Sequence, residues 1–463
     1  MLGLFIAFLV TAAVAWLIAK KAYAAAVLLI AGVVLMFCSV AFDIGKGLEL
    51  KKSTGNTFFD VFQVVQNIMS SNISGLGLSI MAMGGFAKYM DTLNAGHALY
   101  SVVGGPLNHV KSPYVLACMG FVVTQIVGMA IPSAAGLALM LMVTLYPVLI
   151  RAGVSRMTAV AIIGSSRFFD LGPGSANCLL VAKIANIEWA EYFLEWQIIV
   201  YPFLFVTMIV SHYFVQRYWD AKEGPDPEAE KIRQQFHDAA GQPDAGAPKI
   251  YALLPVVPLA ILLIFNPIVI GQFGYNIKVD VPGAIVLSVL VAMAFEWVRR
   301  RDVIGMLKGM KDFYEGMGRQ FAIVVSLIIG GQVFGQGLIA IGAVDTLIES
   351  AQNAGLGVGF MVLAMSSVIG IVAFLMGSGN APFFSFAALV PDIAAKMNVH
   401  VISILMPLQN MAGFGRTVSP VTGAIVAVAG IAGVSPFQIV KRNLIPLALT
   451  TIVNFVVTFA FFL

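Results

Sequence analysis

Charged side chains are rare in the apolar parts of this sequence, and three of them lie beside interruptions rich in Gly, Pro, Ser and Asn. Arg416 directly precedes Thr417 in the second half of the chain, and Arg167 and Asp170 occupy the matching place in the first half. A guanidinium group binds a carboxylate through two parallel hydrogen bonds, so Arg416 predicts a partner with a carboxylate. Arg167 and Asp170 are three residues apart. They indicate either an ion pair on one helix face or a charged site for a ligand or a coupled proton.

Short neutral side chains surround the same interruptions. They can hold carboxylate oxygens, or share a cation with backbone carbonyls that a broken helix leaves free; alternatively they only satisfy the backbone where a helix bends. Because the set occurs twice in register, we favour a binding site. With Arg416, the candidate binding residues are Ser133, Gly136, Ser175, Asn177, Ser378, Gly379, Asn380, Thr417, Ser419 and Thr422. The sequence contains no firm metal site, and a coupling sodium ion, if one is used, is expected near Ser133, Ser378 and Asn380.

The composition is that of a membrane protein. The chain has 463 residues, of which 59% are hydrophobic and only 11% are charged, and its mean hydropathy is +0.92. In ordinary soluble domains about a quarter of the residues are charged. At roughly 20 apolar residues per crossing, the chain can hold on the order of ten spans. This excludes a single-span receptor and a large extramembrane enzyme domain.

Motifs for catalysis or nucleotide use are absent. The sequence lacks a His-Glu-x-x-His metal helix, a Gly-x-x-x-x-Gly-Lys phosphate loop and a dinucleotide fingerprint. Its net charge of +4 is a mild basic excess that membrane topology explains without nucleic acid. We therefore expect no enzyme activity, no cofactor and no nucleic-acid partner.

A hydrophilic stretch at residues 217–249 divides the chain into two halves that repeat. In the first half, IPSAAG at 131–136 precedes an apolar arm that ends at Pro147, and in the second, GSGNAP at 377–382 precedes an arm that contains Pro391. The shift from Pro147 to Pro391 is 244 residues, and that from Pro173 to Pro420 is 247. One internal duplication explains both shifts. An odd number of crossings in each half makes the two copies, residues 1–216 and 250–463, inverted repeats.

Each half contains one interrupted pair of apolar segments and one interrupted span. We predict re-entrant hairpins at residues 113–150 and 356–395, and broken helices at 154–186 and 400–430. Amphipathic stretches at 58–69 and 303–317 precede ordinary spans. Most Lys and Arg residues, Arg442 among them, fall on one side of this topology, which makes that side cytoplasmic. Residues 217–249 are then a cytoplasmic linker, and both termini are periplasmic.

Broken helices inside a bilayer indicate a binding site. Lipid cannot hydrogen-bond a backbone, so irregular chain survives there only where protein or a water-filled cavity satisfies it. Paired Gly- and Pro-interrupted segments in inverted repeats are typical of secondary transporters, whose substrate binds near the midplane. Half-helix N-termini offer unpaired N–H groups and a positive dipole end, which suits an anion. The expected fold is an all-α integral membrane protein with two inverted repeats, about ten transmembrane helices, two re-entrant hairpins and two broken helices.

Several separated motifs resemble one transporter family over essentially the whole chain. They are GFAKYM at 85–90, SAAGLALMLMVTLYP at 133–147, VFGQGL at 333–338, GSGNAPF at 377–383, GRTVSPVTG at 415–423 and VAVAGIAGVSPFQIVKR at 426–442. Together they resemble the anaerobic C4-dicarboxylate carriers of the DcuC family, within the larger ion-transporter superfamily. Residues 165–177 depart from that pattern, because Arg167 and Asp170 stand where uncharged residues are expected.

The resemblance implies exchange, uptake or efflux of succinate, fumarate, malate or aspartate across a bacterial inner membrane, coupled to protons or sodium. It also implies an elevator, in which the hairpins and broken helices move against a scaffold that often forms a homodimer. Ser133, Ser378, Gly379, Asn380, Arg416, Thr417 and Thr422 match the family's hairpin and broken-helix motifs. Two alternatives stay open. A carrier for another organic anion or an acidic amino acid would differ around Arg167 and Asp170, and an anion channel would conduct without saturation or counterflow.

Overall fold

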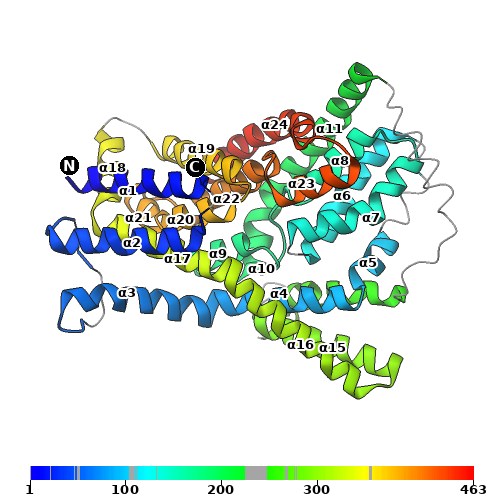
Figure 1. Ribbon diagram of the computed structural model, residues 1–463, viewed down its shortest axis with the longest axis horizontal. Helices are drawn as coiled ribbons and strands as arrows, with labels where there is room; N and C mark the ends of the chain where they lie inside the picture. Colours follow the sequence, from blue (N-terminus) through cyan, green and yellow to red (C-terminus); the bar gives the residue numbers. More distant parts are fainter. Residues whose placement is uncertain are drawn as a thin grey trace.

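The computed structural model describes residues 2–20, 22–45, 47–48, 53–103, 110, 112–131, 133–224, 248–265, 270–275, 277, 279–353 and 357–463. These residues form helices, turns and irregular segments, and no strand occurs among them. Figure 1 shows α3 (Thr57–Asn72) and α4 (Leu78–Thr92) in line as one long rod, crossed by a second rod formed by α16 (Val303–Gln320) and α17 (Ser326–Ala340). The expected all-α fold is confirmed for the described part of the chain.

Six of the described helices are long and apolar enough to cross a bilayer. They are α2 (Ala24–Ala41), the helix Trp189–Glu223, α15 (Val281–Arg300), the helix Val303–Ala340, α19 (Val358–Met376) and α24 (Pro436–Phe462). Shorter apolar helices include α1 (Leu2–Ala19), α6 (Pro113–Ala130), α9 (Ala176–Ala185), η4 (Lys249–Val256) with α13 (Val257–Ile264), and α23 (Gly423–Ala432). The structure thus has the helices of a multi-pass membrane protein, and the expected ten crossings stay a prediction.

Each of the two rods joins an amphipathic part to an apolar part. α3 continues through the π turn η1 (Ile73–Gly77) into α4, and α16 continues through the π turn η6 (Phe321–Val325) into α17. The two π turns begin 248 residues apart, close to the shifts found in the sequence. In each half, the amphipathic stretch and the span after it are therefore one helix. The inverted relation of the halves stays a prediction.

Small residues let the long helices pack backbone to backbone. α4 packs on α16, and α2 packs on α17. A Cβ atom on Gly316 would lie 2.7 Å from the carbonyl oxygen of Gly84, and one on Gly32 would overlap the carbonyl of Val333. Lipid is as apolar as a hydrophobic side chain, so such close packing supplies much of the energy that associates helices in a bilayer.

Helices that pack on each other fill the segments predicted as hairpins: α6 packs on α7 (Ala134–Arg151), and α19 packs on α20 (Asn380–Ala387). α6 ends at Ala130 and α7 begins four residues later, where Ser133 caps it by accepting a hydrogen bond from the Gly136 N–H at 3.1 Å. α19 ends at Gly377, whose φ of +69° suits glycine, and is followed by α20 and α21 (Val390–Met397). The second arm divides between α20 and α21 because Pro391, in the first turn of α21, has no N–H to continue a helix. The depth of both pairs in a bilayer stays a prediction.

Two helices are interrupted inside the core. Residues 165–175 separate α8 (Arg156–Gly164) from α9, and residues 418–422 separate α22 (Val401–Thr417) from α23. We call these two segments the first break and the second break. Ser155 and Ser175 begin α8 and α9 by accepting hydrogen bonds from the N–H groups of Thr158 and Cys178 at 3.0 and 3.4 Å. Every side chain from 165 to 171 is buried, so the first break places irregular backbone where its polar groups need protein partners.

The helix Trp189–Glu223, formed by α10 (Trp189–Glu191), η3 (Tyr192–Gln197) and α11 (Ile198–Glu223), packs on α24. The linker was predicted to begin at residue 217, and this boundary is wrong because residues 217–223 are helical. The reason is that Arg442 of α24 donates hydrogen bonds to Asp220 and Glu223 at 2.6 and 2.5 Å, which holds the end of α11 in place. Residues 225–247 of the predicted linker lie outside the described residues.

Candidate functional site

The side chain of Asp170 is the centre of a charged cluster at the first break. Its Oδ1 accepts a hydrogen bond from Arg416 Nη2 at 2.9 Å, and Arg167 Nη2 lies 3.8 Å from the same oxygen. Its Oδ2 accepts a hydrogen bond from Asn177 Nδ2 at 2.7 Å. Arg416 comes from the end of α22, whereas the other three residues belong to the first break and the start of α9. The structure therefore joins predicted residues from both halves in one cluster.

Both arginines also bind backbone. Arg167 Nη1 donates to the Gly128 carbonyl of α6 at 2.7 Å, and Arg416 Nη2 donates to the Arg167 carbonyl at 2.8 Å. Arg167 and Asp170 do form an ion pair, but the alternative that placed it on one helix face is wrong, because residues 165–175 are not helical. Asp170 lies closer to Arg416, 246 residues away, than to Arg167.

The cluster carries one surplus positive charge, because two guanidinium groups share one carboxylate. The exposed fractions of the side chains are 9% for Arg167, 2% for Asp170 and 12% for Arg416. A charge in apolar surroundings is costly unless it is paired, so this surplus attracts an anion. Arg416 is the most exposed of the three, and its Nε is buried with no hydrogen-bond partner among the described residues. The arrangement has the charge and the free donor that a carboxylate requires.

Side chains from three helices converge on the backbone carbonyl of Asp170. Cys178 Sγ donates to it at 2.8 Å, Gln197 Nε2 at 3.2 Å, Tyr201 Oη at 3.3 Å and Gln409 Nε2 at 3.2 Å. A carbonyl oxygen has two lone pairs, so four donors are more than it can engage fully at once. The first break is thereby attached to α9, to the helix Trp189–Glu223 and to α22 together.

The first break and α22 also touch through aromatic rings and backbone. Phe168 stacks on Phe414, with ring centroids 4.4 Å apart and an angle of 12° between the planes. A Cβ atom on Gly413 would lie 2.7 Å from the carbonyl oxygen of Phe168. Glycine at position 413 is therefore needed for α22 to come this close, and this approach is what brings Arg416 to Asp170.

The tip of the second hairpin packs on the second broken helix. A Cβ atom on Gly377 would lie 2.9 Å from the backbone nitrogen of Thr422, and one on Gly379 would overlap the carbonyl of Ala412. The residues between and after these glycines, Ser378 and Asn380, are half-buried. The tip therefore lies against the chain on either side of Arg416.

The tip of the first hairpin lies near the start of α23. A Cβ atom on Gly423 would lie 3.9 Å from the Cβ atom of Ala135. Ser133 and Gly136, on either side of Ala135, are exposed. The predicted residues of this hairpin thus lie beside the second broken helix, but no hydrogen bond links them to the cluster around Asp170 in the part of the chain that the structure describes.

Several of the predicted hydroxyl groups satisfy local backbone. Thr417 Oγ1 donates to the Gly413 carbonyl at 2.8 Å, and Thr422 Oγ1 donates to the Arg416 carbonyl at 2.5 Å. These bonds agree with the interpretation that such residues support a bent helix. Ser419 differs, because its buried Oγ has no partner among the described residues.

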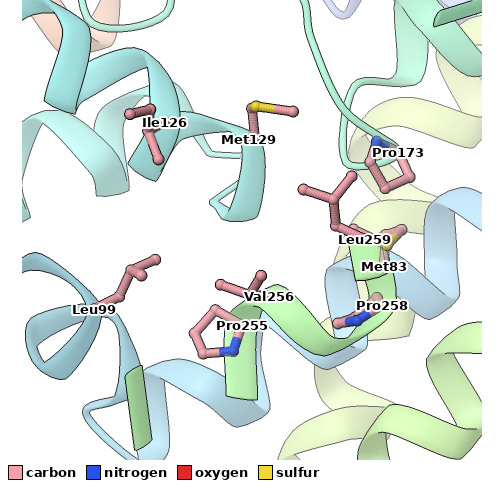
Figure 2. A pocket seen from close by; sticks show the side chains of 9 residues that line it. All are labelled: Met83, Leu99, Ile126, Met129, Pro173, Pro255, Val256, Pro258 and Leu259. Carbon is pink, nitrogen blue, oxygen red and sulfur yellow. The ribbon is translucent and has the colours of Figure 1, made fainter. Parts of the chain in front are cut away.

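A cavity of about 90 Å³ lies beside the first break, and all of its lining side chains are apolar. Figure 2 shows Ile126 and Met129 of α6, with Pro173 of the first break, across from Pro255 and Val256 of η4. Because its lining side chains are all apolar, the cavity offers no side-chain hydrogen-bond donor to a carboxylate. The charged cluster, and not this cavity, is the candidate site.

No group of three or more His, Cys, Asp or Glu residues in the described part of the chain could hold a metal ion. The sodium site expected near Ser133, Ser378 and Asn380 would use hydroxyl and amide oxygens instead of His, Cys, Asp or Glu ligands, and it stays a prediction.

Part of the site lies outside the residues that the sequence predicts. Gln197, Tyr201 and Gln409 were not singled out, although polar residues in apolar helices are a signal in a membrane protein. Arg442 was counted among the basic residues of the cytoplasmic side, yet it is 1% exposed and paired with Asp220. The distribution of Lys and Arg residues indicates which side of the membrane a loop lies on, but it does not indicate whether a given side chain is buried.

The sequence of residues 2–463 matches the model of a protein family described as the C4-dicarboxylate anaerobic carrier, DcuC. The chain belongs to this DcuC family. A Vibrio cholerae relative, named as a probable anaerobic C4-dicarboxylate transporter DcuC, is 32% identical over 450 residues, which are 97% of this chain and 95% of that protein. The anaerobic C4-dicarboxylate transporter DcuC of Escherichia coli K12 is 31% identical over 455 residues, which are 98% and 96% of the two chains. This DcuC-family chain is therefore a transporter and not an enzyme.

Two solved structures share the fold of this DcuC-family chain. The YdaH transporter of Alcanivorax borkumensis aligns with a TM-score of 0.55 at 14% identity, over 93% of this chain and 96% of that one. MtrF of Neisseria gonorrhoeae, described as illuminating a class of antimetabolite efflux pumps, aligns with a TM-score of 0.58 at 11% identity, over 97% of each chain. At these identities the likeness concerns the fold alone.

Proposed function

We propose that this chain is a secondary active transporter of C4-dicarboxylates such as succinate, fumarate, malate or aspartate in the bacterial inner membrane. Family membership and the two relatives named as C4-dicarboxylate transporters support the substrate class. The observation that carries the proposal is the buried cluster of Arg167, Asp170 and Arg416, whose surplus positive charge lies where two helices are broken. A dicarboxylate is attracted to such a site.

Arg416 binds one carboxylate of the substrate in this proposal. Its free Nε supports this role, because a guanidinium that already uses Nη2 on Asp170 keeps a second donor for a ligand. The remaining candidates belong to the two hairpins and the two broken helices. They are Ser133, Gly136, Ser175, Asn177, Ser378, Gly379, Asn380, Thr417 and Thr422.

Asp170 couples substrate binding to a proton. A substrate carboxylate that takes the Arg416 guanidinium places a second negative charge beside Asp170, and a proton on Asp170 removes the resulting repulsion. The direct contact of Asp170 with both arginines supports this role. Exchange of one dicarboxylate for another, and sodium bound near Ser133, Ser378 and Asn380, are the alternative modes.

Transport follows an elevator mechanism in this proposal. The hairpins at 113–150 and 356–395 and the broken helices move against a scaffold made of the other spans, in a chain of two inverted repeats and about ten crossings. The close contacts of each hairpin with α22 or α23 support one moving unit. The linker is cytoplasmic, both termini are periplasmic, and the scaffold forms a homodimer in the bilayer.

The test uses purified protein in liposomes. Wild-type protein is expected to accumulate or exchange labelled succinate, and Arg416→Ala and Asn380→Ala are expected to abolish this while both variants remain folded. Lys183→Ala is a matched control, because Lys183 is a cationic residue of α9 with an exposed side chain. It is expected to keep wild-type activity. Full transport activity in both Arg416→Ala and Asn380→Ala would contradict the assignment of the site.

The second candidate is a carrier for an acidic amino acid or another organic anion. Asp170 favours it, because a carboxylate beside two arginines can bind an ammonium group while the arginines bind carboxylates. A competition panel of dicarboxylates against amino acids separates the two candidates, and proton and sodium gradients imposed separately identify the coupling ion. An anion channel would conduct without saturation or counterflow.

A further inference from the structure

Asp170 lies in irregular chain, so no helix fixes its position. Residues 165–175 are not helical, yet the Asp170 carboxylate meets Arg416 at 2.9 Å. The backbone carbonyl of Asp170 supplies the attachment. Gln197 Nε2 and Gln409 Nε2 each donate a hydrogen bond to this oxygen at 3.2 Å. A carbonyl oxygen has two lone pairs, so two amide donors, one from each half of the chain, suffice to fill it.

The hydroxyl group of Tyr201 organises both glutamines. It carries one proton, and its nearer acceptor is Asn410 Oδ1 at 2.8 Å, against 3.3 Å for the Asp170 carbonyl. Its lone pairs then face the amides, and Gln197 Nε2 donates to it at 3.2 Å and Gln409 Nε2 at 3.5 Å. Each amide nitrogen has two N–H groups, so each serves the carbonyl and the hydroxyl together. We call these contacts the Tyr201 network.

Further hydrogen bonds hold the Tyr201 network to the surrounding helices. Asn410 Nδ2 donates to Asn454 Oδ1 of α24 at 2.7 Å, and Tyr192 Oη donates to Gln409 Oε1 at 3.0 Å. The tyrosine and the two glutamines at its centre are at most 3% exposed. Bulk water does not compete for their bonds, and a buried polar network of this kind makes the structure around it rigid.

We propose that Tyr201 is a positioning residue for the substrate site: through Gln197 and Gln409 it holds Asp170 where its carboxylate orients the Arg416 guanidinium. The inference rests on the proposed function and deepens it. Tyr201 acts only through Asp170 and does not touch the substrate. A site whose charged groups are held in place before the ligand arrives loses less freedom on binding, so it binds the ligand more tightly.

The experiment compares Tyr201→Phe with wild-type protein in counterflow of labelled succinate. Initial rates in liposomes over a range of succinate concentrations give KM and the maximal rate. The variant keeps the aromatic ring and loses the hydroxyl, and it is expected to raise KM about tenfold while changing the maximal rate by less than about twofold. This split indicates weaker binding, whereas a loss of folded protein lowers the maximal rate and leaves KM unchanged.

Tyr89→Phe is the matched control. Tyr89 of α4 is 2% exposed, and its buried hydroxyl has no hydrogen-bond partner among the described residues. This variant is expected to leave KM and the maximal rate unchanged. Gln197→Met and Gln409→Met test the same network from the two halves of the chain. Each removes one donor to the Asp170 carbonyl at nearly constant size, so each is expected to raise KM as Tyr201→Phe does.

Hydrogen exchange provides a measurement on wild-type protein alone. Backbone amides of residues 165–171, followed by mass spectrometry in liposomes, are expected to exchange slowly because the Tyr201 network holds the first break closed. Tyr201→Phe is expected to speed this exchange and to leave that of α4 unchanged. Rapid exchange of residues 165–171 in wild-type protein would overturn the inference without the need for a folded variant.

The transport data separate this inference from the proposed function. Tyr201→Phe with a wild-type KM, whether or not its maximal rate falls, contradicts a positioning role. Absence of succinate counterflow in wild-type protein would overturn the proposed function and the inference with it. Normal counterflow in wild-type protein, with KM unchanged in Tyr201→Phe, would overturn the inference alone.

Discussion

Asp170 balances the two arginines beside it, and this sets the first prediction. Asp170→Asn leaves two buried guanidinium groups without a counter-charge, so it is expected to lower the free energy of unfolding by about 3–5 kcal/mol. Adding Arg416→Gln removes one of those charges and is expected to restore part of the loss. The measurement is thermal unfolding of the purified protein in detergent.

Asp302→Asn is the control for this change. Asp302 caps α16 by accepting a hydrogen bond from the Gly305 N–H at 2.9 Å, and asparagine caps a helix as well as aspartate does. The control is expected to change the free energy of unfolding by no more than about 0.5 kcal/mol. A double variant less stable than Asp170→Asn alone would contradict the charge-balance argument.

At this scale the sequence predicted which charges matter but not how they pair. The scarcity of charge in apolar segments singled out Arg167, Asp170 and Arg416. Spacing reports only on neighbours along one element, so it offered Arg167 as the partner of Asp170, whereas Arg416 from the other half is closer. Gln197 and Gln409 were not predicted because both donate hydrogen bonds to the backbone carbonyl of Asp170. Every residue has a backbone carbonyl, so the sequence does not show which one a side chain binds.

The close packing of α4 on α16 gives a prediction at the scale of elements. A Cβ atom on Gly316 would lie 2.7 Å from the Gly84 carbonyl, whereas one on Gly318 would meet nothing within 4 Å. Gly316→Ala is expected to lower the free energy of unfolding by about 1–3 kcal/mol, because the helices must move apart. Gly318→Ala is its control in the same helix and is expected to raise stability by about 0.5–1 kcal/mol. Melting temperatures of the two variants in detergent, if equal or reversed in order, would contradict this packing.

The sequence located the interruptions better than it described them. Gly and Pro residues indicated where helices stop: α22 lies within the predicted range 400–430, and α23 ends two residues beyond it, at Ala432. Gly-Pro-Gly at 172–174 predicts a short interruption, because the composition of residues 165–170 is compatible with a helix. The first break is longer than this prediction, since it also includes residues 165–170. Side chains of other helices bind carbonyl groups in this segment. Gln125 Nε2 donates at 3.2 Å to the Ser165 carbonyl, which also accepts from the Phe168 N–H, and Arg416 Nη2 donates at 2.8 Å to the Arg167 carbonyl. Such competition for backbone acceptors is not written in the local sequence.

At the scale of the whole molecule, the two halves build one site together. The first break supplies Asp170, and α22 of the second half supplies both Arg416 and Gln409 to it. Repetition along the sequence predicted that interruptions come in pairs. It did not predict that the pair would meet, because that depends on how helices distant in sequence pack, as α2 does on α17 and α4 on α16.

Arg442 forms a second connection between the two halves, after the one between Asp170 and Arg416. It links α24, where it lies, to the end of α11 and the start of α8. Its side chain, 2% exposed, donates to Asp220 and Glu223 of α11 at 2.6 and 2.5 Å and to Thr158 of α8 at 3.2 Å. Arg442→Leu removes the ion-pair partner of Asp220 and leaves Glu223, among the described residues, with only the exposed Lys441, at 3.8 Å. It is expected to lower the free energy of unfolding by about 3–5 kcal/mol, as is typical when one partner of a buried ion pair is removed.

The neighbouring Lys441 provides the control for Arg442→Leu. Its side chain is 54% exposed and lies 3.8 Å from Glu223, so Lys441→Leu is expected to cost no more than about 1 kcal/mol. Thermal unfolding in detergent compares the two variants, and equal melting temperatures would contradict a structural role for Arg442. The same contacts hold the start of α8, where Ser155 Oγ donates to Asp220 at 2.8 Å. Because α8 leads directly into the first break, Arg442→Leu is also expected to reduce succinate counterflow in liposomes, whereas Lys441→Leu is expected to leave it unchanged.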